Sequence, residues 1–289
     1  MTANKKAVFI LLGQSNAVGH GVPMDEADKI TAPLANVFGL HRRDNQRLHP
    51  TALTWSGYTS DGMNLGEEQD HTYSLANCLA ADWQHRIDGG DALPDLYIVQ
   101  IAIGAQGVTK EYMWYPFREE KLIPGKLGTA DISLFPFTVR ILSLLKDSLG
   151  TFDILGLHWR GGENDVTADT SDLQTELHEI YCRIFREFSS ILNDPPIVLH
   201  KLCCPDRMND MDPTGGHLAN MHLINRVFAE LADSHSNISL FDVNNAPFYE
   251  NVGREKGVFL PDAVHYTAKT NRWVAESITE QYIKRLTIK

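Results

Sequence analysis

A buried strand that runs directly into a serine is the feature that most constrains this chain. Residues 7–12 read Ala-Val-Phe-Ile-Leu-Leu and lead into Gly13-Gln14-Ser15-Asn16. An unbroken apolar run of this length is typical of a parallel strand covered on both faces. Gly13 permits a sharp turn, so Ser15 is expected just past the carboxyl end of the strand, where ligands bind in open α/β sheets. The pattern fits a nucleophile, and it also fits a serine that caps the next helical turn.

The rest of the chain alternates between predicted strands and predicted helices. Apolar runs predict strands over 96–103, 152–159, 197–203 and 238–243, and helical periodicity predicts helices over 71–87, 134–149, 171–192, 215–232 and 267–286. This alternation predicts an α/β fold in which a mainly parallel sheet carries helices on both faces. No linker divides the chain, so we expect a single domain over residues 1–289.

Two long segments interrupt this alternation. Residues 19–70 are rich in Gly, Pro, Asp and Asn and predict a long irregular insertion, and residues 109–136 predict a second excursion above the sheet. The second segment carries Trp114, Tyr115 and Phe117, which suit sugar rings or seal the loop onto the core. We expect these segments to shape the substrate pocket.

One predicted helix has clear internal signals. Ser171-Asp172-Leu173-Gln174 has the form of a capping box, and the helix over 171–192 carries an apolar stripe at helical spacing. The stripe consists of Leu173, Leu177, Ile180, Ile184 and Phe188.

Charge and composition exclude several classes of protein. The net charge is −11 and no Lys/Arg run occurs, which argues against nucleic acid or an anionic membrane as the main partner and suits a neutral substrate such as a sugar ester. No stretch of about 18 apolar residues predicts a membrane span. The short apolar run after Lys5-Lys6 lacks a cleavage site, so we expect a cytoplasmic protein. The four cysteines lack Cys-x-x-Cys spacing and are expected to be reduced.

Residues with matching chemistry follow the predicted strands. Gly104 ends one strand, Asn164 follows another, and the last loop carries Asp262 and His265. Because the carboxyl ends of parallel strands meet at one edge of a sheet, these residues are expected near Ser15. A serine hydroxyl needs a positioned base, so we predict Ser15 as nucleophile, His265 as base and Asp262 as the acceptor of the Nδ1 proton. The amides of Ser15 and Gly104 and the side chain of Asn164 are the predicted oxyanion donors.

Other interpretations of the same residues remain open at this stage. Asp262 and His265 also fit a helix-start acid and a surface histidine, and Asn164-Asp165 fits a simple turn. His217 and His222 are five residues apart, which suits one helix face poorly, and no His-Glu-x-x-His or Cys/His cluster occurs. The glycines do not form a phosphate-binding Gly-x-x-x-x-Gly-Lys run. We therefore predict neither a metal nor another cofactor.

Taken together, four sequence blocks resemble those of the SGNH hydrolases. They are Gly13-Gln14-Ser15-Asn16, Gly104, Trp159-Arg160-Gly161-Gly162-Glu163-Asn164-Asp165 and Asp262-x-x-His265. More closely, they resemble the branch of sialate O-acetylesterases and acetylxylan esterases. The resemblance runs from Leu11 to Tyr266 and implies a flavodoxin-like, three-layer α/β/α fold. It also implies metal-free hydrolysis of O-acetyl groups on carbohydrates through an acyl-enzyme.

Two departures from the branch pattern affect the predicted oxyanion hole. The branch usually has Trp-x-Gln-Gly-Glu-Ser-Asp, whereas this chain has Gly161 at the Gln position and Asn164 at the Ser position. Gly162-Glu163-Asn164-Asp165 instead fits the Gly-x-Asn-Asp block of the wider superfamily, whose Asn is an oxyanion donor. Gly104-Ala105 stands where the branch tends to have Gly-Gly. Gln14 and Glu163 are expected to support the site without taking part in the reaction. For Glu163 the reason is that a carboxylate beside an oxyanion would oppose the developing charge.

The sequence therefore predicts a serine carbohydrate O-acetylesterase of sialate or xylan type, acting on a small-molecule or oligosaccharide acetyl ester. One alternative is a lipase-like or thioesterase-like member of the superfamily that acts on longer acyl chains. The other alternative is a carbohydrate-binding protein without catalytic activity.

Overall fold

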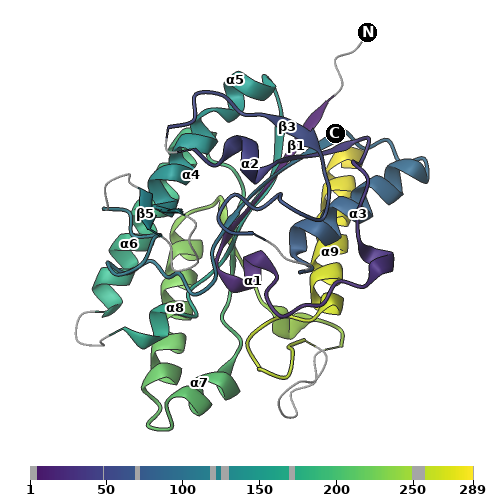
Figure 1. Cartoon of the computed structure of the whole chain (residues 1–289). Helices are drawn as coiled ribbons and strands as arrows, with labels where there is room; N and C mark the ends of the chain where they lie inside the picture. Colours follow the sequence, from purple (N-terminus) through teal and green to yellow (C-terminus); the bar gives the residue numbers. More distant parts are fainter. Residues whose placement is uncertain are drawn as a thin grey trace.

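A seven-stranded sheet forms the centre of the computed structural model (Figure 1). The structure describes residues 5–47, 49–68, 72–117, 122–124, 130–168, 173–248 and 258–288. The strand order is β3-β2-β4-β1-β7-β8-β9, and all neighbours are parallel except β2 and β3. The strands are β1 (Lys6–Gly13), β2 (Val37–Leu40), β3 (Trp55–Gly57), β4 (Asp95–Ala102), β7 (Asp153–Arg160), β8 (Ile197–His200) and β9 (Ile238–Phe241).

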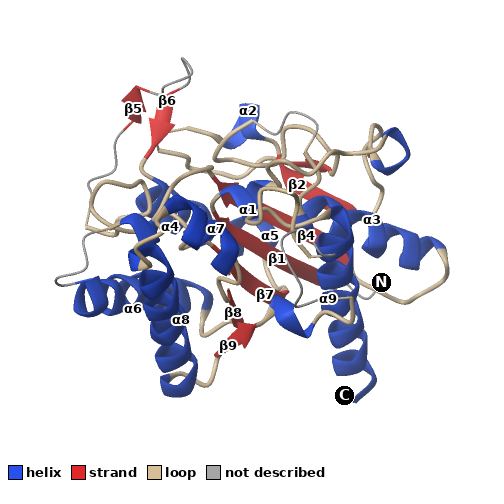
Figure 2. Ribbon diagram, turned by 90° about the horizontal axis from the view of Figure 1, so that it is seen from below, coloured by secondary structure: helices blue, strands red, loops and turns tan. Residues whose placement is uncertain are grey.

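Helices cover both faces of this sheet (Figure 2). One face carries α3 (Leu75–Asp88) and α9 (Ala268–Ile288), which pack on each other. The other face carries α4 (Leu134–Ser143), α5 (Leu145–Leu149), α6 (Leu173–Leu192) and α8 (Gly216–Ser234). This arrangement confirms the predicted three-layer α/β/α fold.

Shorter elements complete the described chain. Three short helices lie outside the helical layers on the two faces of the sheet: α1 (Ser15–Val18), α2 (Arg42–Asn45) and α7 (Pro205–Met211). The connections also contain the 3-10 turns Glu26–Asp28, Asp165–Thr167 and Val243–Asn245. A small antiparallel hairpin consists of β5 (Leu122–Pro124) and β6 (Ala130–Ile132).

Strand β1 is the central strand and is buried on both faces. Val8, Ile10 and Leu12 belong to the core on one face of the sheet, and the alternate residues of β1 belong to the core on the other face. After β1 the chain crosses first to β2 and β4 on one side and later to β7, β8 and β9 on the other. The carboxyl end of β1 is therefore a topological switch point, which is where open α/β sheets bind ligands. Ser15 follows directly.

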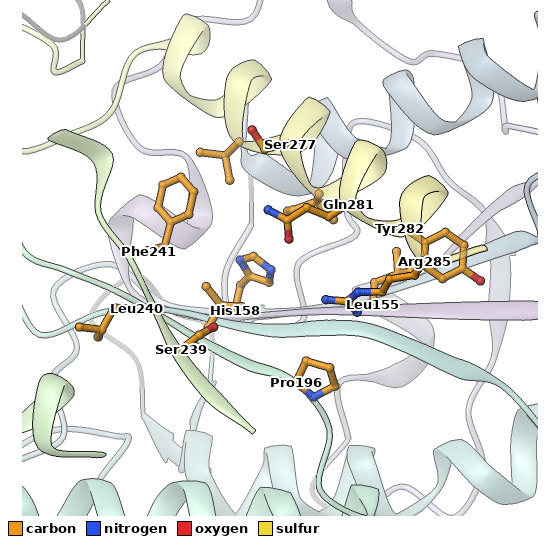
Figure 3. Close-up of a pocket in the computed structure, with 13 residues that line it drawn as sticks. Leu155, His158, Pro196, Ser239, Leu240, Phe241, Ser277, Gln281, Tyr282 and Arg285 are labelled. Atoms are coloured by element: carbon orange, nitrogen blue, oxygen red, sulfur yellow. The ribbon is translucent and has the colours of Figure 1, made fainter. Parts of the chain in front are cut away.

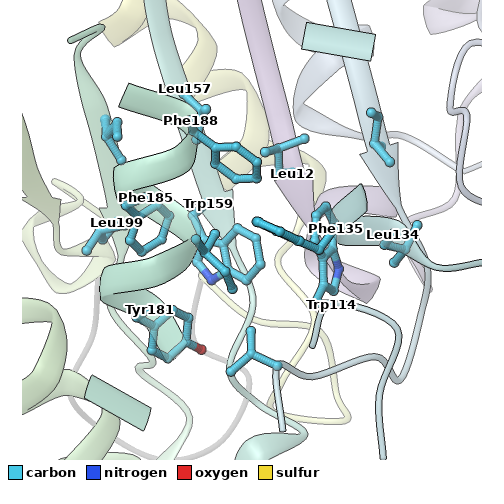
Figure 4. Close-up of a cluster of buried hydrophobic side chains, with 14 of the residues drawn as sticks. Leu12, Trp114, Leu134, Phe135, Leu157, Trp159, Tyr181, Phe185, Phe188 and Leu199 are labelled. Atoms are coloured by element: carbon cyan, nitrogen blue, oxygen red, sulfur yellow. The ribbon is translucent and has the colours of Figure 1, made fainter. Parts of the chain in front are cut away.

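An aromatic cluster packs against this switch point (Figure 4). Trp159 of β7 meets Trp114 edge-on at a ring-centroid distance of 5.0 Å, and it also contacts Tyr181 and Phe185 of α6. Trp114 is fully buried, and its Nε1 donates a hydrogen bond to the carbonyl of Gly13 (3.0 Å). Trp114 therefore fastens the loop after β4 to the end of β1 and offers no face to a sugar.

The predicted irregular insertion over 19–70 is partly wrong. It contains β2, which pairs with β4, and β3, which pairs with β2. The Val37–Leu40 run is only four residues long and includes Gly39, so its local signal for a strand is weak. Pairing with a distant strand, which no local pattern reveals, extends the sheet on this side.

The helix predictions hold with shifted boundaries. The helix predicted over 71–87 begins at Leu75, because Ser74 and Asn77 form a capping box there. The helix predicted over 134–149 is divided at Leu144 into α4 and α5.

Helix α6 shows the predicted apolar stripe, and two short helices, α2 and α7, were not predicted. The stripe positions Leu177, Ile180, Ile184 and Phe188 are fully buried. The side chain of Leu173 and the predicted capping box over 171–174 lie outside what the structure describes. Helix α7 follows β8 without having been predicted.

Gly13 provides a testable constraint on the fold. Its φ is +139°, and a Cβ placed there would lie 1.9 Å from the backbone carbonyl oxygen of Arg160. We expect Gly13→Ala to lower the free energy of unfolding by more than about 3 kcal/mol, because two strands would have to separate. Gly150 is the matched control, since its φ is also positive but a Cβ there has no heavy atom within 4 Å.

The control isolates the contact from backbone strain. Gly150→Ala should cost about 1 to 3 kcal/mol through its positive φ alone. Urea denaturation of the wild type and both variants gives the comparison. If both variants lost the same free energy of unfolding, the close approach of β1 to β7 would not be the reason that Gly13 excludes a side chain.

Candidate active site

The candidate site is a cleft of about 300 Å³ at the carboxyl edge of the sheet. Ser15 reaches it from the first residue of α1, His265 from the last loop and Asn164 from the loop after β7. Three segments far apart in sequence therefore meet here. The lining residues are Gln14, Ser15, His20, Ala105, Glu163, Asn164, Thr167, Arg207, Met208, Met211, Val264 and His265.

Asp262 and His265 form a hydrogen-bonded pair at one wall of the cleft. His265 Nδ1 lies 2.6 Å from Asp262 Oδ2, and Asp262 Oδ1 accepts hydrogen bonds from the backbone amides of Val264 and His265. Burial tends to raise the pKa of Asp262, but these amide donors and the imidazole hold it below its ordinary value. An ionised Asp262 fixes the tautomer that carries a proton on Nδ1, which leaves Nε2 able to accept a proton.

Asn16 links the three segments that form the site. Its Nδ2 donates to Glu163 Oε1 (2.8 Å) and to the carbonyl of Val264 (3.0 Å), and its Oδ1 accepts from the amide of Tyr266 (3.1 Å). These bonds tie the residue after Ser15 to the loop after β7 and to both sides of His265. Asn16 therefore sets the distance between the serine and the histidine loop.

Two of the predicted oxyanion donors line the cleft. The amide of Ser15 stands at the start of α1 and donates no hydrogen bond to another described residue, and neither does the side-chain amide of Asn164. The first amides of a helix lack partners within the helix and favour negative charge. Both groups are thus available to a ligand.

Gly104, the third predicted donor, is engaged elsewhere. Its amide donates a hydrogen bond to Glu67 Oε2 (2.7 Å), and Gly104 is not among the residues that line the cleft. A carboxylate on this amide would repel a developing oxyanion, so the arrangement does not support Gly104 as a donor. The prediction failed to anticipate Glu67 because this contact joins two loops.

Ala105, the next residue, lies at the cleft with a strained backbone. Its φ is +56°, a left-handed conformation that is unfavourable for a residue with a Cβ, and the residue is exposed. Its amide donates no hydrogen bond to another described residue. Strain of this kind is commonly held in place at functional sites.

His20 and Glu67 form a second histidine–carboxylate pair beside the cleft. His20 Nε2 bonds to Glu67 Oε1, and the His20 ring meets the His265 ring edge-on at a centroid distance of 6.2 Å. Asn64 holds the Glu67 segment against β4, because its side chain accepts from the amide of Ala102 and donates to the carbonyls of Ala102 and Glu67. Glu67 thereby fixes both His20 and the amide of Gly104.

Glu163 and Gln14 support the site in different ways. Burial raises the pKa of Glu163, although its hydrogen bond from Asn16 opposes this shift. Its carboxylate is turned toward Asn16. The backbone amide of Gln14 donates to the carbonyl of Arg160 (2.8 Å), which aligns the turn before Ser15.

Asp165 anchors the loop that carries Ala105. Its Oδ1 accepts hydrogen bonds from the amides of Val108 (2.8 Å) and Thr109 (3.3 Å), and Tyr181 donates to its Oδ2. Burial raises the pKa of Asp165 to about 7 in spite of these donors. A buried carboxyl group therefore holds one wall of the cleft in place.

A second cavity, of about 140 Å³, lies between the sheet and α9 (Figure 3). It shares no lining residue with the candidate site. His158 lines it, and its Nδ1 lies within hydrogen-bond distance, 2.9 Å, of Nε2 of His200. Burial lowers the pKa of His158 to about 3, so this histidine is neutral and contributes to packing.

Within the described ranges, no group of three or more His, Cys, Asp or Glu residues is arranged to hold a metal ion. The same part of the chain contains no helix with the length and hydropathy needed to cross a membrane.

Sequence reasoning missed several residues that form or support the cleft. Asn16 was quoted in the serine motif without a role, although its position beside Ser15 was a usable signal. Ala105 was noted only as a departure from the branch pattern. His20 and Glu67 gave no local signal, because their roles arise from contacts between loops. Arg207 lies on α7, a helix that was not predicted.

No protein-family model matches the sequence, and no curated protein matches it. Among solved structures, a protein from Arabidopsis thaliana is similar at a TM-score of 0.61 and 17% identity, covering 96% of this chain and 98% of that chain. NanS is similar at a TM-score of 0.60 and 16% identity, covering 98% and 99%. A family two carbohydrate esterase from Clostridium thermocellum has a TM-score of 0.45 at 13% identity, covering 98% and 65%. The first two likenesses show a shared three-layer α/β/α fold.

Asp165 yields a prediction about stability and pH. A folded-state pKa near 7, against an ordinary value of 3.8, means that the folded protein binds the proton more tightly than the unfolded chain. This group's stabilising contribution is therefore full below about pH 4 and is lost as pH rises to about 7. We expect Asp165→Asn to remove this loss, since an amide can still accept from Val108 and Thr109.

The stability of Asp165→Asn relative to the wild type should rise by up to about 1.4 kcal/mol per pH unit between pH 4 and 7. Urea denaturation of both proteins at several pH values measures this difference. Because the buried histidines are common to both proteins, their contributions cancel in the difference. A difference that stays constant with pH would contradict the raised pKa.

Proposed function

We propose that this protein is a serine O-acetylesterase that acts on acetylated carbohydrates. The observation that carries the proposal is the Asp262–His265 pair in the same cleft as Ser15. A histidine with its Nδ1 held by a carboxylate is the base that a serine nucleophile requires. The four SGNH-like sequence blocks support the same chemistry.

In the proposed acylation step, Ser15 Oγ attacks the acetyl carbonyl carbon while His265 Nε2 takes the hydroxyl proton. The new bond between Oγ and carbon produces a tetrahedral oxyanion. Collapse of this intermediate breaks the bond between carbon and the sugar oxygen, and His265 returns the proton to that oxygen. The products are the free sugar hydroxyl and an acetyl ester on Ser15.

Deacylation repeats these steps with water. His265 takes a proton from water as the water oxygen attacks the carbonyl carbon of the acetyl-serine. His265 then returns the proton to Ser15 Oγ as acetate leaves. The oxyanion of both steps is assigned to the Ser15 amide, the Asn164 side chain and the Ala105 amide. Ala105 replaces Gly104 in this proposal because the Gly104 amide is bound to Glu67.

The surroundings of the cleft favour a carbohydrate substrate. A neighbouring hollow of about 340 Å³ shares Thr167 with the cleft and is lined by further polar side chains, including Lys110, Tyr112 and Glu176. Together the two hollows offer room for more than one sugar unit. A substrate of this kind supplies hydroxyl groups that such side chains can bind.

Longer acyl chains are the second candidate. Met208, Met211 and Val264 form an apolar portion of the cleft wall, and Met211 is 43% exposed. Flexible thioether side chains adapt to acyl groups of different length. Rates on aryl acetate, butyrate and octanoate distinguish the two candidates: a steep fall beyond acetate supports the acetylesterase, and a rise supports the longer-chain hydrolase.

We expect Ser15→Ala to abolish acetate release from aryl acetates and acetylated sugars. The nucleophile is lost, so the rate should fall by about 10⁴-fold or more. Ser234→Ala, on the exposed end of α8, is the matched control and should keep full activity. Circular dichroism confirms that both variants are folded.

Equal activity of Ser15→Ala and wild type would eliminate Ser15 as nucleophile. Saturable sugar binding without acetate release by the wild type would instead favour the carbohydrate-binding alternative.

The oxyanion assignment is testable separately. Asn164→Ala should lower kcat by about 100-fold, the usual cost of one oxyanion donor. Phosphonylation of Ser15 places a tetrahedral oxygen in the proposed hole, so the Ala105 amide proton should move downfield in spectra of protein labelled with ¹⁵N alanine and glycine. A downfield shift at Gly104 instead of Ala105 would reassign the donor and would require Glu67 to leave that amide.

A further inference from the structure

Helix α7 supplies one wall of the cleft. It follows β8, begins at Pro205, and is held to the core by Met208, which is buried. Arg207 and Met211 also line the cleft. A buried residue in the middle of this helix fixes the placement of Arg207 relative to the edge of the sheet.

Arg207 has the only fixed positive charge among the described residues that line the cleft. Its side chain is half-buried, and no carboxylate of the described chain lies within ion-pair distance of it. Several cations elsewhere, such as Lys201 and Arg272, do have carboxylate partners. Arg226 on the exposed surface of α8 also lacks a carboxylate partner within the described chain, but Arg207 lies in the cleft that contains Ser15.

The neighbouring groups do not neutralise Arg207. It influences the thiol of Cys204, but burial raises the pKa of that thiol well above its ordinary value, so the thiol carries no charge. Glu163 is the one carboxylate that lines the cleft, and its Oε1 accepts from Asn16. The guanidinium is therefore available to a ligand in the same cleft as Ser15.

We infer that Arg207 selects esters that carry a carboxylate. This inference rests on the proposed function, and it departs from the neutral substrate that net charge alone suggests. A guanidinium binds a carboxylate through paired, charge-assisted hydrogen bonds, and a cleft wall excludes part of the competing water. The carboxylate belongs either to the alcohol, as in an acidic sugar, or to the acyl group, as in a dicarboxylic acid monoester.

Two matched pairs of esters test the inference and distinguish these sources. On the alcohol side, para-acetoxybenzoate is compared with neutral para-acetoxybenzamide. On the acyl side, phenyl hydrogen succinate is compared with phenyl butyrate. The quantity measured is the ratio of kcat/KM for the anionic ester to that for its neutral partner, in the wild type and in Arg207→Met.

Arg207→Met should lower this ratio for one of the two pairs by about 10- to 100-fold, the range expected for a charge-assisted hydrogen bond. Arg207→Lys should retain part of the preference, and added salt should weaken it in the wild type. Arg226→Met is the matched control, because it removes the same charge from the exposed surface of α8, outside the cleft. It should leave the ratio unchanged.

An unchanged ratio in Arg207→Met for both pairs, with hydrolysis still dependent on Ser15, would overturn the inference and leave the proposed function intact. If no ester is hydrolysed, the proposed function fails, and binding then tests Arg207 alone. Calorimetric titration uses para-acetamidobenzoate and succinanilate, the amide analogues of the two anionic esters. For one of them the Kd should be at least about 10-fold weaker in Arg207→Met. Equal Kd values in the two proteins for both analogues would overturn the inference by this second route.

Discussion

The close approach of β1 and β7 at their carboxyl ends is the contact on which the rest of the site depends. Gly13 passes the carbonyl of Arg160 at a distance that no side chain would allow, and the next amide, from Gln14, donates to that carbonyl. This bond sets the turn that carries Ser15 into the cleft. Arg160 then reaches back from β7, because its guanidinium donates to the carbonyl of Asn16 and to the side chain of Asn271 on α9. These contacts tie the segment that carries Ser15 to β7 and to α9.

Local sequence patterns were sufficient to predict the elements whose structure depends mainly on residues that are neighbours in the chain. The apolar run before Gly13 identified the central strand, and the three-residue spacing of Asp262 and His265 identified a pair that is observed at 2.6 Å. Contacts between distant loops carry no such signal. Strand β2 owes its pairing to β4, and Glu67 meets the Gly104 amide only because Asn64 fastens its loop to the sheet. The catalytic assignments remain predictions, whereas the fold that brings these residues together is observed.

The proposed oxyanion would form among several carboxylates, and hydrogen bonds to these carboxylates reduce the repulsion. Glu67 is bound by His20 and the Gly104 amide, and Glu163 is bound by Asn16. Asp165 accepts from two amides of the loop after β4, and Asp262 is bound by His265. Each carboxylate has donors of its own, which reduces its repulsion of a charge that forms beside Ser15. The amides of Ser15 and Ala105 remain without such partners among the described residues. The carboxylates around the cleft thus have hydrogen-bond donors of their own, although burial still raises the pKa of Glu163 and Asp165, and other donors stay open within the cleft.

The division between rigid and adaptable elements suggests how such a site acquires specificity. Ser15 and Asn164 follow central strands, whose backbone is fixed by pairing on both sides, so reactive groups can be held accurately. Arg207 and Met211 come from a seven-residue helix beyond the shorter strand β8, held in part by Met208. Changes in this helix would alter what the cleft binds without disturbing the turn after β1. Under the proposed function, the placement of the reacting groups would therefore depend on the sheet, and substrate selection would depend on α7 and the neighbouring loops.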